Sequence, residues 1–302
     1  DYEVRKEPVG PCLLLSPWNM PVILAARKIG GSLSAGCSAI LKPPEETPAS
    51  VARMVECFVD AGLPPGVLNL VFGVPSEVSQ HLIASDVIRK VSFTGSVGVG
   101  QHLARLAAPG LKRVTLELGG HSPVIVFDDA DVDACVRLLV AAKFRNAGQL
   151  CHAPTRFLVQ RGAYARFVER FAAAAASLRV GDGLEEGTEM GPLPNDRRLR
   201  PMRELVDTTR GVGTLVTGGQ QVRDAGYYFA PTVFADVAPH APAMHNEPFG
   251  PVALIRPFDE PADALQVANS TRFGLASYVF TDSAKLQRRM TEGLHVGSVA
   301  IN

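Results

Sequence analysis

The chain has 302 residues, of which 46% are hydrophobic, and this is enough for two domains with separate cores. Its 30 basic and 30 acidic side chains give a formal net charge of zero, without a basic stripe or an acidic tail. No apolar run is long enough to cross a bilayer, and the first residues do not have the pattern of a signal peptide. We therefore expect neither nucleic acid nor a membrane as a partner.

The cysteines and histidines bear on cellular location and on metal binding. The five cysteines are Cys12, Cys37, Cys57, Cys135 and Cys151. Their number is odd, they are widely spaced and no C-x-x-C occurs, which indicates reduced thiols and a cytoplasmic protein. The seven histidines form neither H-x-x-x-H nor H-E-x-x-H, so we predict no metal site.

The first part of the chain alternates nearly continuous apolar runs with helical segments. In chain order, strands are expected at 11–15, 37–41, 67–72, 87–93 and 114–118, and helices at 21–35, 47–62, 77–84 and 97–107. Pro21 and Thr47-Pro48 fit the first turns of their helices, and Gly62 fits a helix end. This alternation is typical of a parallel, doubly wound α/β sheet.

The double glycine Gly119-Gly120 marks a boundary. After it, a strand at 124–127 and a helix from about residue 131 begin a second unit that alternates in the same way. We therefore expect an α/β fold with two doubly wound parallel domains, residues 1–119 and 120–302.

Both ends of the sequence have the pattern of a truncated chain. Residues 1–7 read as one polar strand with no partner in sight, and residues 299–302 end inside an apolar run. Because such unpaired segments normally have neighbours, we expect the chain to be a piece of a longer protein.

The stretch from Phe144 to Cys151 joins an apolar helical run to a strand-like run at 156–159. A turn between a helix and a strand can present its last side chain to a cleft, which makes Cys151 a candidate nucleophile. Such a nucleophile needs a base, because a free thiol is mostly protonated at neutral pH. The alternative reading of a single cysteine is a small buried hydrophobe.

Two polar residues stand at the ends of expected strands. Glu117 ends a strand that we expect to be buried, and Gly119-Gly120 lets the chain turn sharply after it, so its carboxylate could deprotonate a water molecule. Asn19 joins the first strand to the first helix, where its amide could stabilise an oxyanion. The alternatives are a solvent-facing glutamate and a helix-capping asparagine.

Three further loops have the composition of ligand-binding turns. Lys42 and Glu45 follow the second strand, where they could hydrogen-bond a ribose, and a carboxylate there would repel a 2′-phosphate. Gly95-Ser96 begins a helix and could bind a phosphate, although the spacing is not G-x-G-x-x-G. The proline-bracketed loop from Glu247 to Pro251 could hold a carboxylate and an aromatic ring against a ligand. Taken alone, each loop also fits an ordinary solvated turn.

Together these stretches resemble the aldehyde dehydrogenase family. Six motifs occur in the family's order, namely P-W-N-x-P, K-P-x-E-x-T-P, F-T-G-S, E-L-G-G, F-x-N-x-G-Q-x-C and E-P-F-G-P. The match extends over essentially the whole chain, and Cys151 falls on the cysteine of its motif. The resemblance implies an aldehyde dehydrogenase-like α/β fold and an oxidoreductase that converts an aldehyde into a carboxylic acid with NAD or NADP.

The catalytic roles follow from the same resemblance. Cys151 would be the nucleophile that forms a thiohemiacetal and, after hydride transfer, a thioester. Asn19 and the backbone N–H of Cys151 would form the oxyanion hole. Glu117 would activate the water molecule that hydrolyses the thioester.

The resemblance also implies a Rossmann-like NAD-binding domain at residues 1–119 and a C-terminally truncated catalytic domain at 120–302. The residues that would bind the cofactor are Trp18, Asn19, Lys42, Pro43, Pro44, Glu45, Gly95, Ser96, Val99, Leu118, Glu247 and Phe249. Glu45 favours NAD, and NADP is the alternative cofactor. Residues 1–7 would be the remnant of an oligomerisation hairpin, and the full-length protein is expected to be a homodimer or homotetramer.

The substrate is expected to be a small aldehyde that carries a distant carboxylate. The stretches around Arg145 and Arg27 look most like those of succinate-semialdehyde dehydrogenases, and the two guanidinium groups would bind the carboxylate. Two details depart from that subfamily, because His121 follows E-L-G-G and a Glu-Pro pair replaces the usual Glu-Thr. Position 153 is Ala, so Cys151 has no neighbouring cysteine for a disulfide.

Four alternatives remain open at this point. The first is a dehydrogenase for general aliphatic or aromatic aldehydes. An acylating dehydrogenase that passes the acyl group to coenzyme A would not need Glu117. A cysteine esterase would leave Lys42, Glu45 and Ser96 without a purpose. A non-catalytic relative would not need Cys151, Glu117 and Asn19 together.

Overall fold

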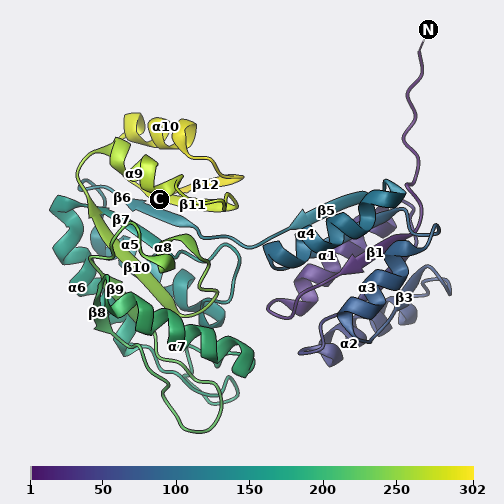
Figure 1. Ribbon diagram of the computed structural model, residues 1–302, viewed down its shortest axis with the longest axis horizontal. Coiled ribbons are helices and arrows are strands. Elements are labelled where there is room, and N and C mark those ends of the chain that lie inside the picture. Colours follow the sequence, from purple (N-terminus) through teal and green to yellow (C-terminus); the bar gives the residue numbers. More distant parts are fainter. Residues whose placement is uncertain (1) are drawn as a thin grey trace. The chain divides into compact units, whose positions relative to one another are not determined.

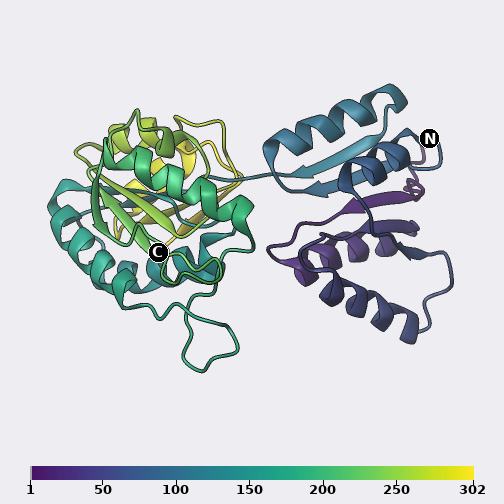
Figure 2. The ribbon, with the colours of Figure 1, turned by 60° about the horizontal axis from the view of Figure 1, so that its bottom comes forward.

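The computed structural model describes residues 2–302 of the chain. They form two compact units, of which the first ends at Leu118 and the second comprises Gly119–Asn302. Each unit is built on its own β-sheet, with helices packed on both faces (Figure 1, Figure 2). No helix within residues 2–302 is both long and apolar enough to cross a membrane.

The first unit contains a parallel sheet with the strand order β3-β2-β1-β4-β5. Its strands are β1 (Cys12–Leu15), β2 (Ala39–Lys42), β3 (Leu68–Leu70), β4 (Lys90–Thr94) and β5 (Arg113–Glu117). Its helices are α1 (Pro21–Ser34), α2 (Pro48–Asp60), α3 (Pro75–Ala84) and α4 (Val97–Ala107), followed by the short 3-10 helix η1 (Ala108–Gly110). This order is that of a Rossmann-type sheet, in which ligands bind beyond the carboxyl ends of the strands.

Strand β1 lies at the centre of this sheet, and its apolar sequence explains why. Leu14 packs with Ala25 and Ile29 of α1 on one face. Leu13 packs with Ile83 of α3 and Leu103 of α4 on the other face. Successive residues of a strand point to opposite faces, so a strand that helices cover on both sides must be apolar throughout.

The second unit contains a sheet with the strand order β12-β11-β6-β7-β10-β9-β8. Its strands are β6 (Pro123–Val126), β7 (Arg156–Gln160), β8 (Thr214–Thr217), β9 (Thr232–Ala235), β10 (Val252–Phe258), β11 (Ala276–Phe280) and β12 (Ser298–Ile301). Its helices are α5 (Val132–Phe144), η2 (Arg145–Gly148), α6 (Arg161–Ser177), α7 (Asp196–Arg210), α8 (Pro242–His245), α9 (Pro261–Ala268) and α10 (Ala284–Gly293). Helices α5 and α6 cover one face, and α9 and α10 cover the other.

Aromatic side chains fill the core under α5 and α6. The ring of Phe157 on β7 lies 4.9 Å from that of Phe171 and 6.1 Å from that of Phe167, measured between centroids. Phe144, the last residue of α5, adds a fourth ring at 6.1 Å from Phe171. The first residue of the F-x-N-x-G-Q-x-C motif therefore anchors the end of α5 in the core.

The α/β fold class is confirmed, and three expected details are wrong. Residues 2–7 form no strand, because a strand needs a hydrogen-bonded neighbour and Tyr2 and Val4 are exposed; residue 1 lies outside the described part of the chain. Strand β5 is not buried, because it lies at the edge of its sheet. Strand β8 runs antiparallel to β9, so the second sheet is not wholly parallel. The assignment of residues 1–7 to an oligomerisation hairpin stays a prediction.

Candidate active site

Cys151 lies at the end of a tight turn that begins where α5 ends. Asn146 and Ala147 have left-handed backbone angles, with φ of 51° and 52°. This conformation is uncommon for residues with a side chain and clusters at functional sites. Gln149 closes the turn, because its backbone N–H and its side-chain amide both donate to the carbonyl of Asn146, at 3.1 and 2.8 Å. The turn leaves Cys151 partly exposed.

Two glycines allow other backbone segments to approach this turn. Gly148 has a φ of +70°, and a Cβ atom there would collide with the backbone carbonyl of Gly250. A Cβ atom on Gly120 would collide with the carbonyl oxygen of Cys151. Gly120 of E-L-G-G and Gly148 of G-Q-x-C therefore allow close backbone contacts within the second unit, to Cys151 and to Gly250 of E-P-F-G-P.

The residues that follow Cys151 form a second tight turn. The N–H of Ala153 donates to the carbonyl of Leu150 at 3.0 Å, and the hydroxyl of Tyr278 on β11 donates to the carbonyl of His152 at 2.7 Å. The Nδ1 atom of His152 lies 3.9 Å from the Sγ atom of Cys151. Burial, and secondarily the charge of Cys151, raise the pKa of Tyr278, so its phenol stays a proton donor at neutral pH.

The loop after α8 holds Glu247 in a half-buried position. Its Oε1 atom accepts a hydrogen bond from the N–H of Gly120 at 3.1 Å. Burial raises the pKa of Glu247 to about 7, against the opposing effects of this hydrogen bond, Arg198 and Lys143. Burial also lowers the pKa of Lys143 to about 7, against the opposing charge of Glu247. A half-buried acid and a buried base of the second unit thus titrate in the same range.

Arg198 of α7 fixes the backbone of this loop. One Nη2 atom donates to the carbonyls of Pro248 and Phe249, at 2.8 and 3.0 Å. The guanidinium group also lies over the Phe249 ring, 5.4 Å from its centroid. Sequence reasoning did not find Arg198, because no local pattern links α7 to a loop 50 residues later.

In the first unit, several predicted site residues follow the carboxyl ends of strands. Trp18 and Asn19 are half-buried between β1 and α1. The N-cap of α1 is Met20, so the alternative that Asn19 caps this helix is wrong. Lys42, the last residue of β2, forms an ion pair with Glu45 at 3.2 Å; the lysine side chain is 7% exposed and the glutamate side chain 54%.

The Gly95-Ser96 turn leads from β4 into α4. Ser96 is the N-cap of α4, and its hydroxyl accepts a hydrogen bond from the N–H of Val99 at 3.4 Å. The N–H of Gly95 donates to the carbonyl of Glu117 at 3.0 Å, so this donor, which we expected to meet a phosphate, is used inside the sheet. The first-turn N–H groups of α4 still lack partners within their helix, and they can bind an anion.

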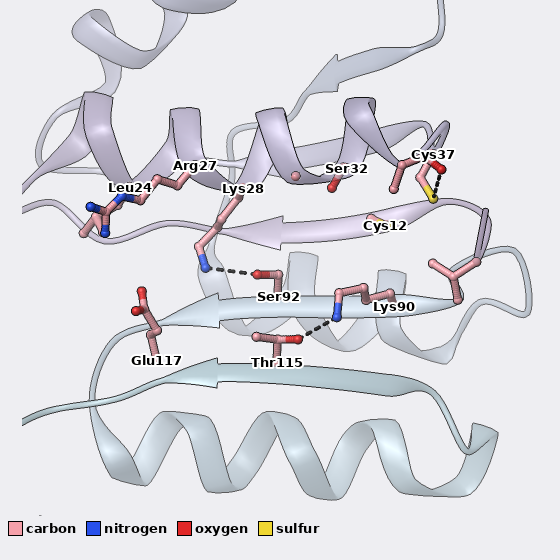
Figure 3. Close-up of a pocket in the computed structure, with 13 residues that line it drawn as sticks. Cys12, Leu24, Arg27, Lys28, Ser32, Cys37, Lys90, Ser92, Thr115 and Glu117 are labelled. Carbon is pink, nitrogen blue, oxygen red and sulfur yellow. Dashed lines mark hydrogen bonds between the residues drawn. The ribbon is translucent and has the colours of Figure 1, made fainter. Parts of the chain in front are cut away.

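Glu117 ends β5 and lines a cavity of about 440 Å³ together with Arg27 and Lys28 of α1 (Figure 3). The hydroxyl of Thr94 lies 3.5 Å from its Oε2 atom and donates to it. Glu117 is exposed, so the expected buried setting is wrong. Lys28 donates to the Ser92 hydroxyl at 3.1 Å, and burial lowers its pKa to about 8 against the opposing charge of Glu117. Sequence reasoning passed over Lys28, although it adjoins Arg27.

The predicted catalytic and substrate-binding residues belong to different units. Cys151 and the exposed Arg145 lie in the second unit. Asn19, Glu117 and Arg27 lie in the first, where Arg27 and Glu117 line the same cavity. Within residues 2–302, no cluster of three His, Cys, Asp or Glu side chains could hold a metal ion.

Comparison with known proteins places this chain among a large group of relatives. The sequence profile of the aldehyde dehydrogenase family matches residues 1–302. The 4-(hydroxymethyl)benzenesulfonate dehydrogenase TsaD1 of Comamonas testosteroni is 55% identical to the chain, over 99% of the chain and 62% of its own length. The NADP(+) succinate-semialdehyde dehydrogenase GabD of Escherichia coli is 40% identical over the same shares.

Solved structures agree with these matches. The crystal structure of succinate-semialdehyde dehydrogenase from Burkholderia pseudomallei has a TM-score of 0.96 and 40% identity, over 98% of this chain and 62% of its own. The expected aldehyde dehydrogenase-like fold is therefore confirmed. The chain spans about 62% of the length of the curated relatives that it matches. On its motifs, its fold and these similarities, the chain belongs to the aldehyde dehydrogenase family.

Proposed function

We propose that the full-length protein oxidises an aldehyde to a carboxylic acid through a covalent intermediate on Cys151, with NAD as the acceptor. The observation that carries this proposal is the rigid turn that ends at a partly exposed Cys151. A nucleophile held in place by strained backbone and close glycine contacts needs no reorganisation before it attacks.

Each catalytic residue has one chemical task. The Cys151 thiolate attacks the aldehyde carbon, and the amide of Asn19 with the N–H of Cys151 stabilises the oxyanion of the thiohemiacetal. Bound NAD supplies the acceptor for the hydride that leaves this carbon. Glu117 then removes a proton from the water molecule that hydrolyses the thioester and releases the acid.

Features of the first unit support a dinucleotide site at residues 1–119, with residues 120–302 as the catalytic domain. The strand order β3-β2-β1-β4-β5 puts the turn after β1 beside the turn after β4, which is where a Rossmann-type sheet binds its cofactor. A Cβ atom on Gly100 would come 2.5 Å from the side chain of Leu118, so α4 packs closely against the residue that follows β5. Lys42 and Glu45 would hold the adenosine ribose. Glu247 and Phe249 would meet the nicotinamide end.

The substrate that fits best is an aldehyde with a distant anionic group. One relative is named for a benzenesulfonate and others for succinate semialdehyde, and both compounds carry such a group. Arg145 and Arg27 are exposed guanidinium groups, and a guanidinium binds a carboxylate or a sulfonate through paired hydrogen bonds. An uncharged aliphatic or aromatic aldehyde is the alternative. A cytoplasmic location and a homodimeric or homotetrameric state stay predictions.

Cys151→Ala in the full-length enzyme should abolish both aldehyde oxidation and ester hydrolysis, because both need the same thiolate. Activity is measured as NADH formation and as release of a nitrophenol from its ester. Cys57→Ala, at an exposed cysteine of α2, is the control and should keep both activities. If Cys151→Ala still hydrolyses the ester, the nucleophile is a residue other than Cys151.

Glu117→Gln should separate the two half-reactions. Hydride transfer needs no base at this position, so a single burst of NADH should remain, while steady turnover falls by a factor on the order of 10²–10⁴ because the thioester accumulates. Stopped-flow absorbance records both phases, and Glu77→Gln at an exposed position of α3 serves as the control. Steady turnover within a few-fold of wild type would exclude Glu117 as the base.

NAD should be preferred to NADP, because the Glu45 carboxylate would repel a 2′-phosphate. The measurement is kcat/KM for each cofactor in the wild-type enzyme and in Glu45→Gln. Removing the Glu45 carboxylate charge in Glu45→Gln should reduce the ratio of kcat/KM for NAD to kcat/KM for NADP. Equal values in the wild type, or a preference for NADP, would contradict this role of Glu45.

Arg145→Leu should raise KM for succinate semialdehyde far more than for an uncharged aldehyde of similar length. Loss of a charge-assisted hydrogen bond is worth about 1.5–3 kcal/mol, which corresponds to a selective loss of roughly 10- to 100-fold. Arg137→Leu, at an exposed position of α5, is the matched control. An equal effect on both aldehydes would assign Arg145 a structural role and not a substrate-binding one.

A further inference from the structure

A histidine that has no role in the proposed chemistry lies against the proposed nucleophile. The Nδ1 atom of His152 is 3.9 Å from the Sγ atom of Cys151, within the range of a hydrogen bond to sulfur. Side chains adjacent in sequence usually point apart, so this contact needs a special backbone. The turn at Leu150–Ala153 supplies it, through the hydrogen bond of 3.0 Å from the Ala153 N–H to the Leu150 carbonyl.

The position of His152 is fixed from a second side. The hydroxyl of Tyr278 donates to the His152 carbonyl at 2.7 Å, and Tyr278 lies in the middle of β11, between β6 and β12. The backbone of His152 is therefore anchored to the sheet through Tyr278. The residue itself remains exposed. An exposed imidazole can exchange protons with solvent, and it can return the proton to the thiolate that hydrolysis of the thioester releases.

The chemistry of a thiol next to an imidazole is well defined. A free cysteine has a pKa of about 8.5, so only a few per cent is thiolate at neutral pH, and a neighbouring imidazolium lowers this pKa. We propose that His152 activates Cys151 by accepting the thiol proton at Nδ1. The S–H bond breaks, the N–H bond forms and the electron pair stays on sulfur, which requires the tautomer with its proton on Nε2. This inference rests on the proposed function of Cys151 as the nucleophile.

Other titratable groups of the second unit lie near this pair. Tyr278 faces Cys151 from β11, and burial keeps its phenol protonated. The Glu247 carboxylate accepts a hydrogen bond from the N–H of Gly120, and Gly120 lies against the Cys151 carbonyl. The charge of Lys143 lowers the pKa of Glu247. These groups are unchanged in a His152 variant. The difference between the variant and the wild type therefore isolates the imidazole.

The test measures the thiol directly and not turnover. The full-length enzyme without cofactor is treated with iodoacetamide between about pH 5 and pH 10, and alkylation of Cys151 is followed by peptide mass spectrometry. His152→Ala should slow alkylation near pH 7 by roughly 10-fold and move the inflection upward by about one pH unit. His152→Gln keeps a polar side chain without a base in this range and should behave like His152→Ala. His295→Ala, at an exposed residue, should match the wild type.

Three outcomes of these experiments bear on the inference and on the proposed function. If the alkylation rates of the wild type and of His152→Ala converge near pH 10, the thiol is still accessible in the variant. The slower alkylation of the variant near pH 7 then reflects protonation of the thiol and not misfolding. A His152→Ala profile within two-fold of the wild type at every pH would overturn the inference while leaving the proposed function intact. If Cys151→Ala still oxidises aldehydes although the His152 variants shift the profile, the proposed function fails and the Cys151–His152 pair stands.

Discussion

The second unit depends on two places where one backbone segment touches another without room for a side chain. Gly148 lies against the carbonyl of Gly250, and Gly120 lies against the carbonyl of Cys151. Glu247 completes the connection through its hydrogen bond to the N–H of Gly120. Gly120 and Gly148 are thus required by packing, and a side chain at either position would push the cysteine turn out of position.

The same region carries a cost in stability. Because the pKa of Glu247 rises from 4.5 to about 7, the folded state binds its proton more tightly, and its contribution to the free energy of unfolding falls as the pH rises through this range. The pKa of Lys143 falls from 10.5 to about 7, so its unfavourable contribution is relieved only as the pH rises from about 7 toward 10.5. The sum of the two penalties is therefore greatest near neutral pH. Buried groups with such shifts cluster at functional sites, which is where a fold tolerates their cost.

The sequence predicted the local features and missed those that depend on topology. Helix α4 and the turn before Cys151 follow from apolar runs, glycines and a serine cap, which are all local in the chain. The exposure of Glu117 could not be predicted, because β5 becomes an edge strand only through the order of the whole sheet. The anchoring of His152 by Tyr278 joins residues 126 positions apart, and no short-range pattern reports such a contact.

The ion pair between Lys42 and Glu45 is a contact that the sequence did not predict. The sequence identified Lys42 and Glu45 as separate ribose-binding groups, whereas the structure joins them at 3.2 Å. The lysine side chain is nearly buried, while the glutamate side chain is half-exposed. A 2′-phosphate at this position would meet the cation as well as the anion. Under the proposed function, cofactor preference therefore depends less on the presence of Glu45 than on whether its carboxylate stays with Lys42 or swings toward the ribose.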